Sequence, residues 1–154
     1  RLHASKFLLC RASSSICAFP LGHVLETLRP LPIRPVQATP VFVCGLSVIR
    51  GAPVPVVDLT ALIGKARAGS IGRWVTLRLG ERRLALAVEA VLGIRELEVS
   101  TLQALPPLLQ DADHGLIESI GTLDSELLML LEAGRLLPEE IWDALAKEGE
   151  APCR

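Results

Sequence analysis

The chain has 154 residues, a formal net charge of −1, and a composition that is 50% hydrophobic but only 3% aromatic. This length suits a single domain with a sizeable core. The weak charge and the scarcity of aromatic rings argue against nucleic-acid binding, which needs a basic surface and stacking platforms.

The mean hydropathy of +0.43 is high for a soluble monomer. Such a chain either buries its side chains unusually well or keeps an apolar patch for a partner, and we favour the patch. No apolar run approaches the length of a transmembrane helix, and the N-terminus has no signal-peptide core. We therefore expect a cytoplasmic protein that does not insert into the membrane.

The chain opens with two short apolar runs, 7–11 and 16–19, on either side of a serine turn. This pattern predicts a β-hairpin in which Cys10 and Cys17 could face each other. Neither belongs to a CxxC motif, and no histidine stands at ligand spacing. We therefore interpret them as reduced core thiols and expect no metal site.

Residues 21–28 place leucine and valine at helical spacing, which predicts one or two helical turns with Glu26 on the outer side. Prolines at positions 30, 32 and 35 make the following segment extended but exclude a central strand. A further helical turn is expected at 41–43.

The most informative stretch is 44–64, which reads as strand, tight turn, strand and cap. The first strand ends at Arg50, and Gly51 to Pro53 have turn chemistry. The second strand contains Pro55, which lacks an amide proton and predicts an edge position or a bulge.

A short helical turn should follow, capped by Asp58 or Thr60 and closed by Gly64. Two interpretations of Arg50 remain open. It is either a turn arginine in water or a guanidinium at the mouth of an apolar groove, able to take a carboxylate or carbonyl from a bound helix.

In the second half, 65–72 reads as a loop and 74–79 as a strand that turns at Gly80-Glu81. The return strand should run over 82–91 and bend at Gly93. A short turn or helix at 98–105, a solvated loop at 106–115, an extended segment at 116–123 and a buried strand at 127–131 follow. A last helix should begin at Pro138 and stop at Gly149, with an apolar stripe of Ile141, Trp142 and Leu145.

The sequence offers little for catalysis. Ser47 has only the first half of a nucleophile-elbow motif, and the histidines are scattered. Asp58 is better explained as a helix cap than as a catalytic acid. We expect no enzymatic activity and no cofactor, although a small hydrolase using Ser47 or Asp58 remains an alternative.

Several runs resemble the CheW family of bacterial chemotaxis adaptor domains. CAFPLGHVLETL (17–28) resembles the opening "A-I-P-x-x-x-V-x-E-V" of that family. PVFVCGLSVIRGAPVPVVDLTALIG (40–64) resembles its most distinctive block, "P-x-x-V-x-G-V-x-N-L-R-G-x-I-I-P-V-x-D-L-x-x-x-x-G". The second half agrees more loosely, and the similarity extends over about residues 7–137.

The resemblance implies a mainly β fold with two small SH3-like five-stranded β-barrel subdomains around a shared apolar core, short helices and a C-terminal helix. We assign 1–137 to the CheW-like domain and 138–150 to a helical extension. Members are non-enzymatic adaptors that join the cytoplasmic tip helix of a chemoreceptor to the regulatory domain of a CheA-type histidine kinase. The receptor helix is expected in an apolar groove between the subdomains. By motif, the receptor-binding residues are Val24, Glu26, Val48, Arg50 and Gly51.

The sequence departs from the family pattern at three places. Val48 replaces the usual asparagine, Glu132 replaces an aspartate after the last strand, and Glu89 replaces the aspartate of "V-D-x-V". An alternative role is the regulatory CheW-like domain of a larger kinase or receiver fusion. The chain ends soon after the domain, which favours a stand-alone adaptor.

Overall fold

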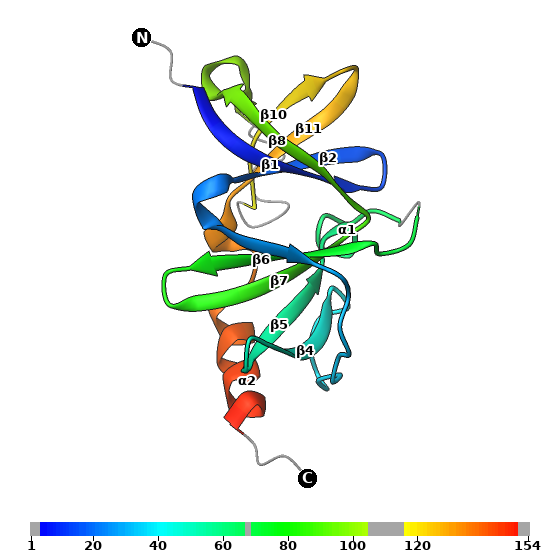
Figure 1. Ribbon diagram of the computed structural model, residues 1–154, viewed down its shortest axis with the longest axis vertical. Coiled ribbons are helices and arrows are strands. Elements are labelled where there is room, and N and C mark those ends of the chain that lie inside the picture. The colour runs from blue at the N-terminus through cyan, green and yellow to red at the C-terminus, as the bar shows by residue number, and fades with distance from the viewer. Residues whose placement is uncertain (1–3, 67–68, 105–115, 151–154) are drawn as a thin grey trace.

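The computed structural model describes residues 4–66, 69–104 and 116–150, whose strands form two sheets (Figure 1). The six-stranded sheet has the order β8-β1-β2-β11-β10-β9. Its strands are β1 (Ala4–Ala12), β2 (Ser15–Pro20), β8 (Ala90–Glu98), β9 (Gln103–Ala104), β10 (Ile117–Leu123) and β11 (Glu126–Leu131).

The second sheet has five strands in the order β3-β6-β7-β5-β4. These are β3 (Val24–Leu28), β4 (Val43–Ile49), β5 (Ala52–Asp58), β6 (Arg73–Leu79) and β7 (Arg82–Val88). The helical pieces are η1 (Leu21–His23), α1 (Leu59–Leu62), η2 (Val99–Thr101), η4 (Ala133–Arg135) and α2 (Glu139–Glu150). The prediction of a mainly β fold with short helices is confirmed, except that one sheet has six strands instead of five.

The chain enters the six-stranded sheet twice. It starts there with β1 and β2, builds the whole five-stranded sheet, and returns with β8 to β11 (Figure 1). The return strand β11 lies parallel to β2, and β8 lies antiparallel to β1. Neither half of the chain can therefore complete the six-stranded sheet alone.

Both faces of the central strands are buried, and successive residues point into different cores. On β7, Leu84 and Leu86 enter a core shared by the two sheets, whereas Ala85 and Ala87 enter the interior of the five-stranded sheet. On β1, Leu8 enters the shared core, whereas Phe7 and Leu9 enter the interior of the six-stranded sheet. The two-residue period of a strand thus divides the apolar side chains among three clusters.

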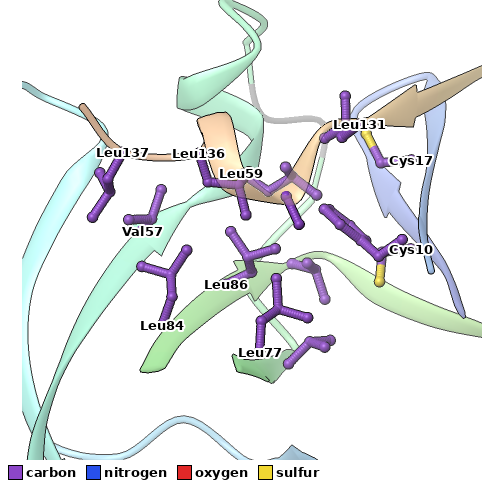
Figure 2. Close-up of a cluster of buried hydrophobic side chains, with 14 of the residues drawn as sticks. Cys10, Cys17, Val57, Leu59, Leu77, Leu84, Leu86, Leu131, Leu136 and Leu137 are labelled. Carbon is purple, nitrogen blue, oxygen red and sulfur yellow. The ribbon is translucent and has the colours of Figure 1, made fainter. Parts of the chain in front are cut away.

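The shared core lies between the sheets (Figure 2). Cys10 and Cys17 from the first hairpin meet Leu59, Leu86 and Leu131 there. Leu136, Leu137 and Leu145 from the C-terminal segment belong to the same cluster. Much of the high hydropathy is therefore used internally, in the boundary between the two sheets.

The five-stranded sheet is curled. Strands β3 and β4 are its two edges, yet Leu28 of β3 and Cys44 of β4 both pack against the interior cluster around Trp74. A flat sheet would hold its edges far apart, because neighbouring strands lie almost 5 Å from each other. The curling brings side chains from β3 close to the β4–β5 turn.

The prediction of a helix over residues 21–28 was wrong. Only η1 is helical, and Val24–Leu28 is strand β3, paired with β6. A bulge lies between Val24 and Glu26, so Val24 packs against the shared core while Leu28 packs against the interior of the five-stranded sheet. The bulge interrupts the two-residue alternation and produces spacing that imitates a helix.

The sequence predicted an edge position or a bulge for the Pro55 strand. The edge position was wrong, because β5 lies between β4 and β7, and the bulge in its ladder with β4 falls between Val43 and Gly45, away from Pro55. The ladder with β7 uses only residues 56–58, so Pro53 and Pro55 pair with β4 alone. The missing amide protons therefore fall outside the second ladder.

Three further predictions need adjustment. The expected strand 82–91 breaks at Glu89, where the chain passes from β7 to β8, and the bulge at Gly93 lies inside β8. The helical turn at 41–43 is a hydrogen-bonded turn in which the amide of Val43 donates to Pro40. Helix α2 begins after Pro138 and continues through Gly149 to Glu150.

Other elements agree with the sequence. The first hairpin, the Gly80-Glu81 turn and the Asp124-Ser125 turn are confirmed. Strand β11 is confirmed and is buried from Leu128 onward, whereas Leu127 is exposed. Leu145 of α2 is buried, and Ile141 and Trp142 pack against the shared core. The segment at 98–105 contains η2 and β9. The loop predicted at 106–115 lies outside the described residues, and the division of domains at residue 137 stays a prediction.

Truncation in the shared core should destabilise both sheets together. Leu86 is fully buried, so Leu86→Ala is expected to lower the free energy of unfolding by about 2–5 kcal/mol. Leu92→Ala, at a leucine that is 43% exposed, should cost less than about 1 kcal/mol. Urea unfolding followed by circular dichroism measures both values, and equal losses would contradict the packing.

The thiols of the first hairpin should be inert in the folded state. Cys10 and Cys17 are register partners with free thiols, and burial raises the pKa of each to about 12. Since the thiolate is the reactive form, both should resist labelling near neutral pH. In a Cys44→Ala, Cys153→Ser background, reaction with a disulfide reagent should follow the rate of unfolding. Immediate labelling of the native protein would refute this.

Candidate functional site

The turn between β4 and β5 consists of Arg50 and Gly51. Ile49 pairs with Ala52 across it, and Arg50 and Gly51 have φ values of 52° and 79°. A two-residue hairpin turn of this kind favours asparagine or glycine, because both central residues take positive φ. The expected turn at Gly51–Pro53 is thus one residue earlier, and Pro53 belongs to β5. Arg50 is one of five non-glycine residues with positive φ among the described residues, and its long side chain makes it an unusual occupant of such a turn.

Arg50 forms a two-pronged ion pair with Glu26 of β3. Its Nε donates to Oε2 of Glu26 at 3.1 Å, and one terminal nitrogen donates to Oε1 at 2.7 Å. The planar guanidinium fork matches a carboxylate in this geometry. The pair connects β3 to the turn after β4, the two edges of the curled sheet.

The pair is solvent-accessible, with 72% of the Arg50 side chain and 31% of the Glu26 side chain exposed. The hydrogen bond from Arg50 lowers the pKa of Glu26, and the same bond raises the pKa of Arg50. Both groups therefore stay charged at neutral pH. Because the Arg50 side chain is largely exposed, it remains accessible to an incoming carboxylate or carbonyl.

A small cavity of about 20 Å³ adjoins this ion pair. We call its lining the Glu26–Arg50 site; the lining residues are Leu25, Glu26, Ile49, Arg50, Val54, Thr76 and Arg83. Thr76 contributes through its hydroxyl, which donates to the backbone carbonyl of Glu26 at 3.2 Å. The site combines charged groups with apolar side chains, which suits recognition of another molecule.

Among the residues that the sequence associates with binding, the structure joins only Glu26 and Arg50. Val48, two residues before Arg50, is 69% exposed but does not line the cavity. Val24 is half-buried against the shared core. Gly51 serves the turn.

The predicted cap residues have structural roles. Asp58 accepts from the amides of Thr60 and Ala61 at 3.1 and 3.4 Å, and Gly64 follows α1 with a φ of 76°. Ser47 is buried and donates to the carbonyl of Pro32 at 2.8 Å. These contacts account for Ser47 and Asp58 without catalysis.

The acidic residues at which the sequence departs from the family pattern are also structural. Glu89 accepts from the amides of Ser13 and Gly69 and from the hydroxyl of Thr60, and so connects two loops and helix α1 where β7 passes into β8. Glu132 accepts from the amide of Gly134 and caps η4. A glutamate can fulfil each role because its partners are backbone amides or a hydroxyl.

Sequence reasoning missed Leu25 and Arg83 as members of the site. Leu25 is the residue left over at the β3 bulge and is 46% exposed. Arg83 has the parity of Ala85 and Ala87, whose side chains enter the interior of the sheet. This alternation could have indicated that Arg83 lies on the same face of β7 as the two alanines. It identifies Arg83 as a member of the site only when β3 and β7 are known to belong to one sheet.

Within the described segments, no helix has the length and apolar character needed to span a bilayer. The same segments contain no group of three or more His, Cys, Asp or Glu residues arranged to hold a metal ion.

These features define a class of protein: a double-sheet β protein with an exposed ion pair that joins the edges of one curled sheet. The family model for the CheW-like domain matches residues 6–140, and the chain belongs to the CheW-like family. Proteins of this family are non-enzymatic scaffolds of chemotaxis systems.

Individual relatives agree with this assignment. The chain is 30% identical over 148 residues to protein FrzA of Myxococcus xanthus, covering 92% of this chain and 91% of that protein. It is 26% identical over 111 residues to chemotaxis protein CheW of Rhizobium meliloti (strain 1021), covering 71% and 72% of the two chains. The crystal structure of scaffolding protein TtCheW from Thermoanaerobacter tengcongensis matches with a TM-score of 0.75 at 21% identity, covering 87% of this chain and 92% of that one. The last match supports the fold.

The ion pair predicts a measurable titration. Since Arg50 lowers the pKa of Glu26, Arg50→Asn should raise that pKa toward its ordinary value. A depressed carboxyl pKa stabilises the fold above the unfolded-state pKa, and this contribution is lost as the pH falls through the folded-state pKa. The carboxyl carbon of Glu26, followed by NMR between pH 2 and 7, reports the change.

Asparagine suits the left-handed turn, so the variant should remain folded. Arg73→Asn, in which an exposed arginine at the far end of β6 is removed, is the control and should leave the Glu26 titration unchanged. An unchanged Glu26 titration in Arg50→Asn would contradict the ion pair.

Proposed function

We propose that this chain is a cytoplasmic adaptor that couples the tip of a chemoreceptor to a CheA-type histidine kinase. Membership of the CheW-like family supports the scaffold role. One observation from the structure carries the finer proposal: Glu26 and Arg50, which the family resemblance associates with receptor contact, form a single accessible ion pair.

The physical logic is that of helix-in-groove recognition. Apolar contact area supplies affinity, and a charged group on the surface sets the register of the bound helix. Arg50 is suited to the second task because its exposed guanidinium is oriented by Glu26. The backbone strain at Arg50 is consistent with selection for binding at the expense of the turn.

In this proposal the receptor helix lies along the boundary between the two sheets. The shared core fills the interior of that boundary, so the groove must be a shallow surface feature. Exposed apolar side chains on both sheets are available to border it, including Leu25 of β3 and Ile94 of β8, which are 46% and 57% exposed. Val48, Arg50 and Gly51 would extend the contact along the β4–β5 hairpin, and Val24 would contribute from its half-buried position.

The kinase contact is proposed on family membership. The regulatory domain of a CheA-type kinase is expected to have the same fold, so the contact would join two similar β-rich surfaces.

Charge reversal at Arg50 should test the receptor contact. We expect Arg50→Glu to weaken binding to the cytoplasmic tip fragment of a receptor from the same organism by about tenfold or more. Calorimetric titration gives the dissociation constant, and circular dichroism should show an unchanged fold. Arg73→Glu is the matched control, because Arg73 is an exposed arginine whose side chain donates to the carbonyl of its own neighbour, Gly72.

The double variant Glu26→Arg, Arg50→Glu shows whether weak binding results from loss of the ion pair or from loss of the guanidinium at position 50. It can restore an ion pair, but it exchanges the positions of the two charges. Continued weak binding would mean that the partner reads the guanidinium at position 50. Wild-type binding by Arg50→Glu itself would refute the proposed receptor contact.

A further inference from the structure

Arg83 stands out because its charge is not balanced. It lies on β7 directly opposite Arg78 of β6, and both side chains are exposed. Like charges at directly opposed positions of an antiparallel pair are destabilising. The strand pair therefore carries a repulsion that the fold itself does not need.

The two arginines differ in their partners. Arg78 turns back on its own hairpin, where its Nε donates to the carbonyl of Gly80 at 3.1 Å. Within the described residues, Arg83 has neither a hydrogen bond nor an ion pair from its side chain. Its guanidinium therefore retains its donors for another group.

The nearest carboxylate is already occupied. Glu26 lines the same cavity as Arg83, but both of its oxygens accept hydrogen bonds from Arg50. Those bonds lower the pKa of Glu26 most, and the positive charge of Arg83 lowers it further. The Glu26–Arg50 site thus contains more arginine than carboxylate, and its surplus charge is positive.

The space beside Arg83 has two parts of different size. The cavity of about 20 Å³ can hold one small polar group. On its other side, Arg83 and Val54 also line a cleft of about 570 Å³ between the β4–β5 hairpin and α2. Pro53, Pro55 and Trp142 supply apolar surface there.

The α2 wall of this cleft is held in place. The guanidinium of Arg82 makes two bonds of 2.8 Å to Glu139 and lies 4.9 Å from the centre of the Trp142 ring. Asp143 and Glu81 line the same cleft as Arg82 and Arg83, so its lining has two carboxylates and two guanidinium groups. Most of α2 lies beyond residue 140, where the family match ends.

We propose that Arg83 is a second anion-recognising residue of this surface, which binds a carboxylate side chain from the receptor segment that contacts Arg50. The apolar residues of that segment then continue into the α2 cleft. The surplus of positive charge in the Glu26–Arg50 site places the acidic residue of that segment at Arg83. This inference rests on the proposed function, because it specifies the chemistry of the same partner.

The test compares Arg83→Glu, Arg50→Glu and Arg73→Glu in titrations with the receptor tip fragment. Arg83→Glu should weaken binding by about tenfold and make the affinity less sensitive to salt between about 50 and 200 mM. Arg73→Glu should stay within about twofold of the wild type. One acidic-to-lysine change on the receptor fragment should restore binding by Arg83→Glu.

A stability measurement distinguishes recognition from support of the fold. Because the Arg78–Arg83 repulsion and the attraction of Arg83 to Glu26 disappear together, Arg83→Gln should leave the unfolding midpoint nearly unchanged while weakening binding. A purely structural arginine would lower the midpoint instead. If Arg83→Glu does not fold, the binding affinity of Arg83→Gln shows whether Arg83 contributes to receptor recognition.

The possible outcomes separate the two proposals. If Arg50→Glu weakens binding but Arg83→Glu and Arg83→Gln bind as the wild type does, the role of Arg83 is overturned and the proposed function stands. If neither Arg50→Glu nor Arg83→Glu changes binding, the proposed receptor contact fails. Weakening by both, with rescue by the charge-reversed receptor, supports the inference.

Discussion

The structure depends on burying both faces of its central strands. Apolar residues on β1 and β7 alternate between the core shared by the sheets and the interior of each sheet. A strand with one solvent-exposed face would show apolar and polar residues in alternation, but here the residues on both faces must be apolar. This requirement explains a composition that is half hydrophobic with few aromatic rings, since aliphatic side chains fill three narrow layers.

The same packing creates the Glu26–Arg50 site. The five-stranded sheet curls around Trp74 and its neighbours, which brings the edge strand β3 to the turn that follows β4. Glu26 and Arg50 then meet across the edges, and Arg83 reaches the same cavity from β7. These charged groups, distant in the sequence, thus line one cavity because the interior of the sheet beneath them is filled by apolar side chains.

Two features at or beside the Glu26–Arg50 site are unfavourable for local stability. An arginine occupies a left-handed turn position that asparagine or glycine would satisfy more easily, and two arginines oppose each other on β6 and β7. Both features oppose stability locally and both keep guanidinium groups accessible. They are consistent with a scaffold of the CheW-like family, whose task is to hold other proteins.

The sequence by itself determined the hairpins, the Asp58 cap, the α2 stripe and, through its resemblance to a family, the mainly β fold. The same resemblance singled out Glu26 and Arg50, which the structure joins in an ion pair. These features are local or lie in one distinctive block, so neighbouring residues suffice to identify them. Only the tertiary structure decided that 24–28 is a bulged strand, that β5 is central despite Pro55, and that Arg83 joins the site. Each of these depends on which strands lie side by side, and strand pairing between distant segments leaves no periodic signal in the segments themselves.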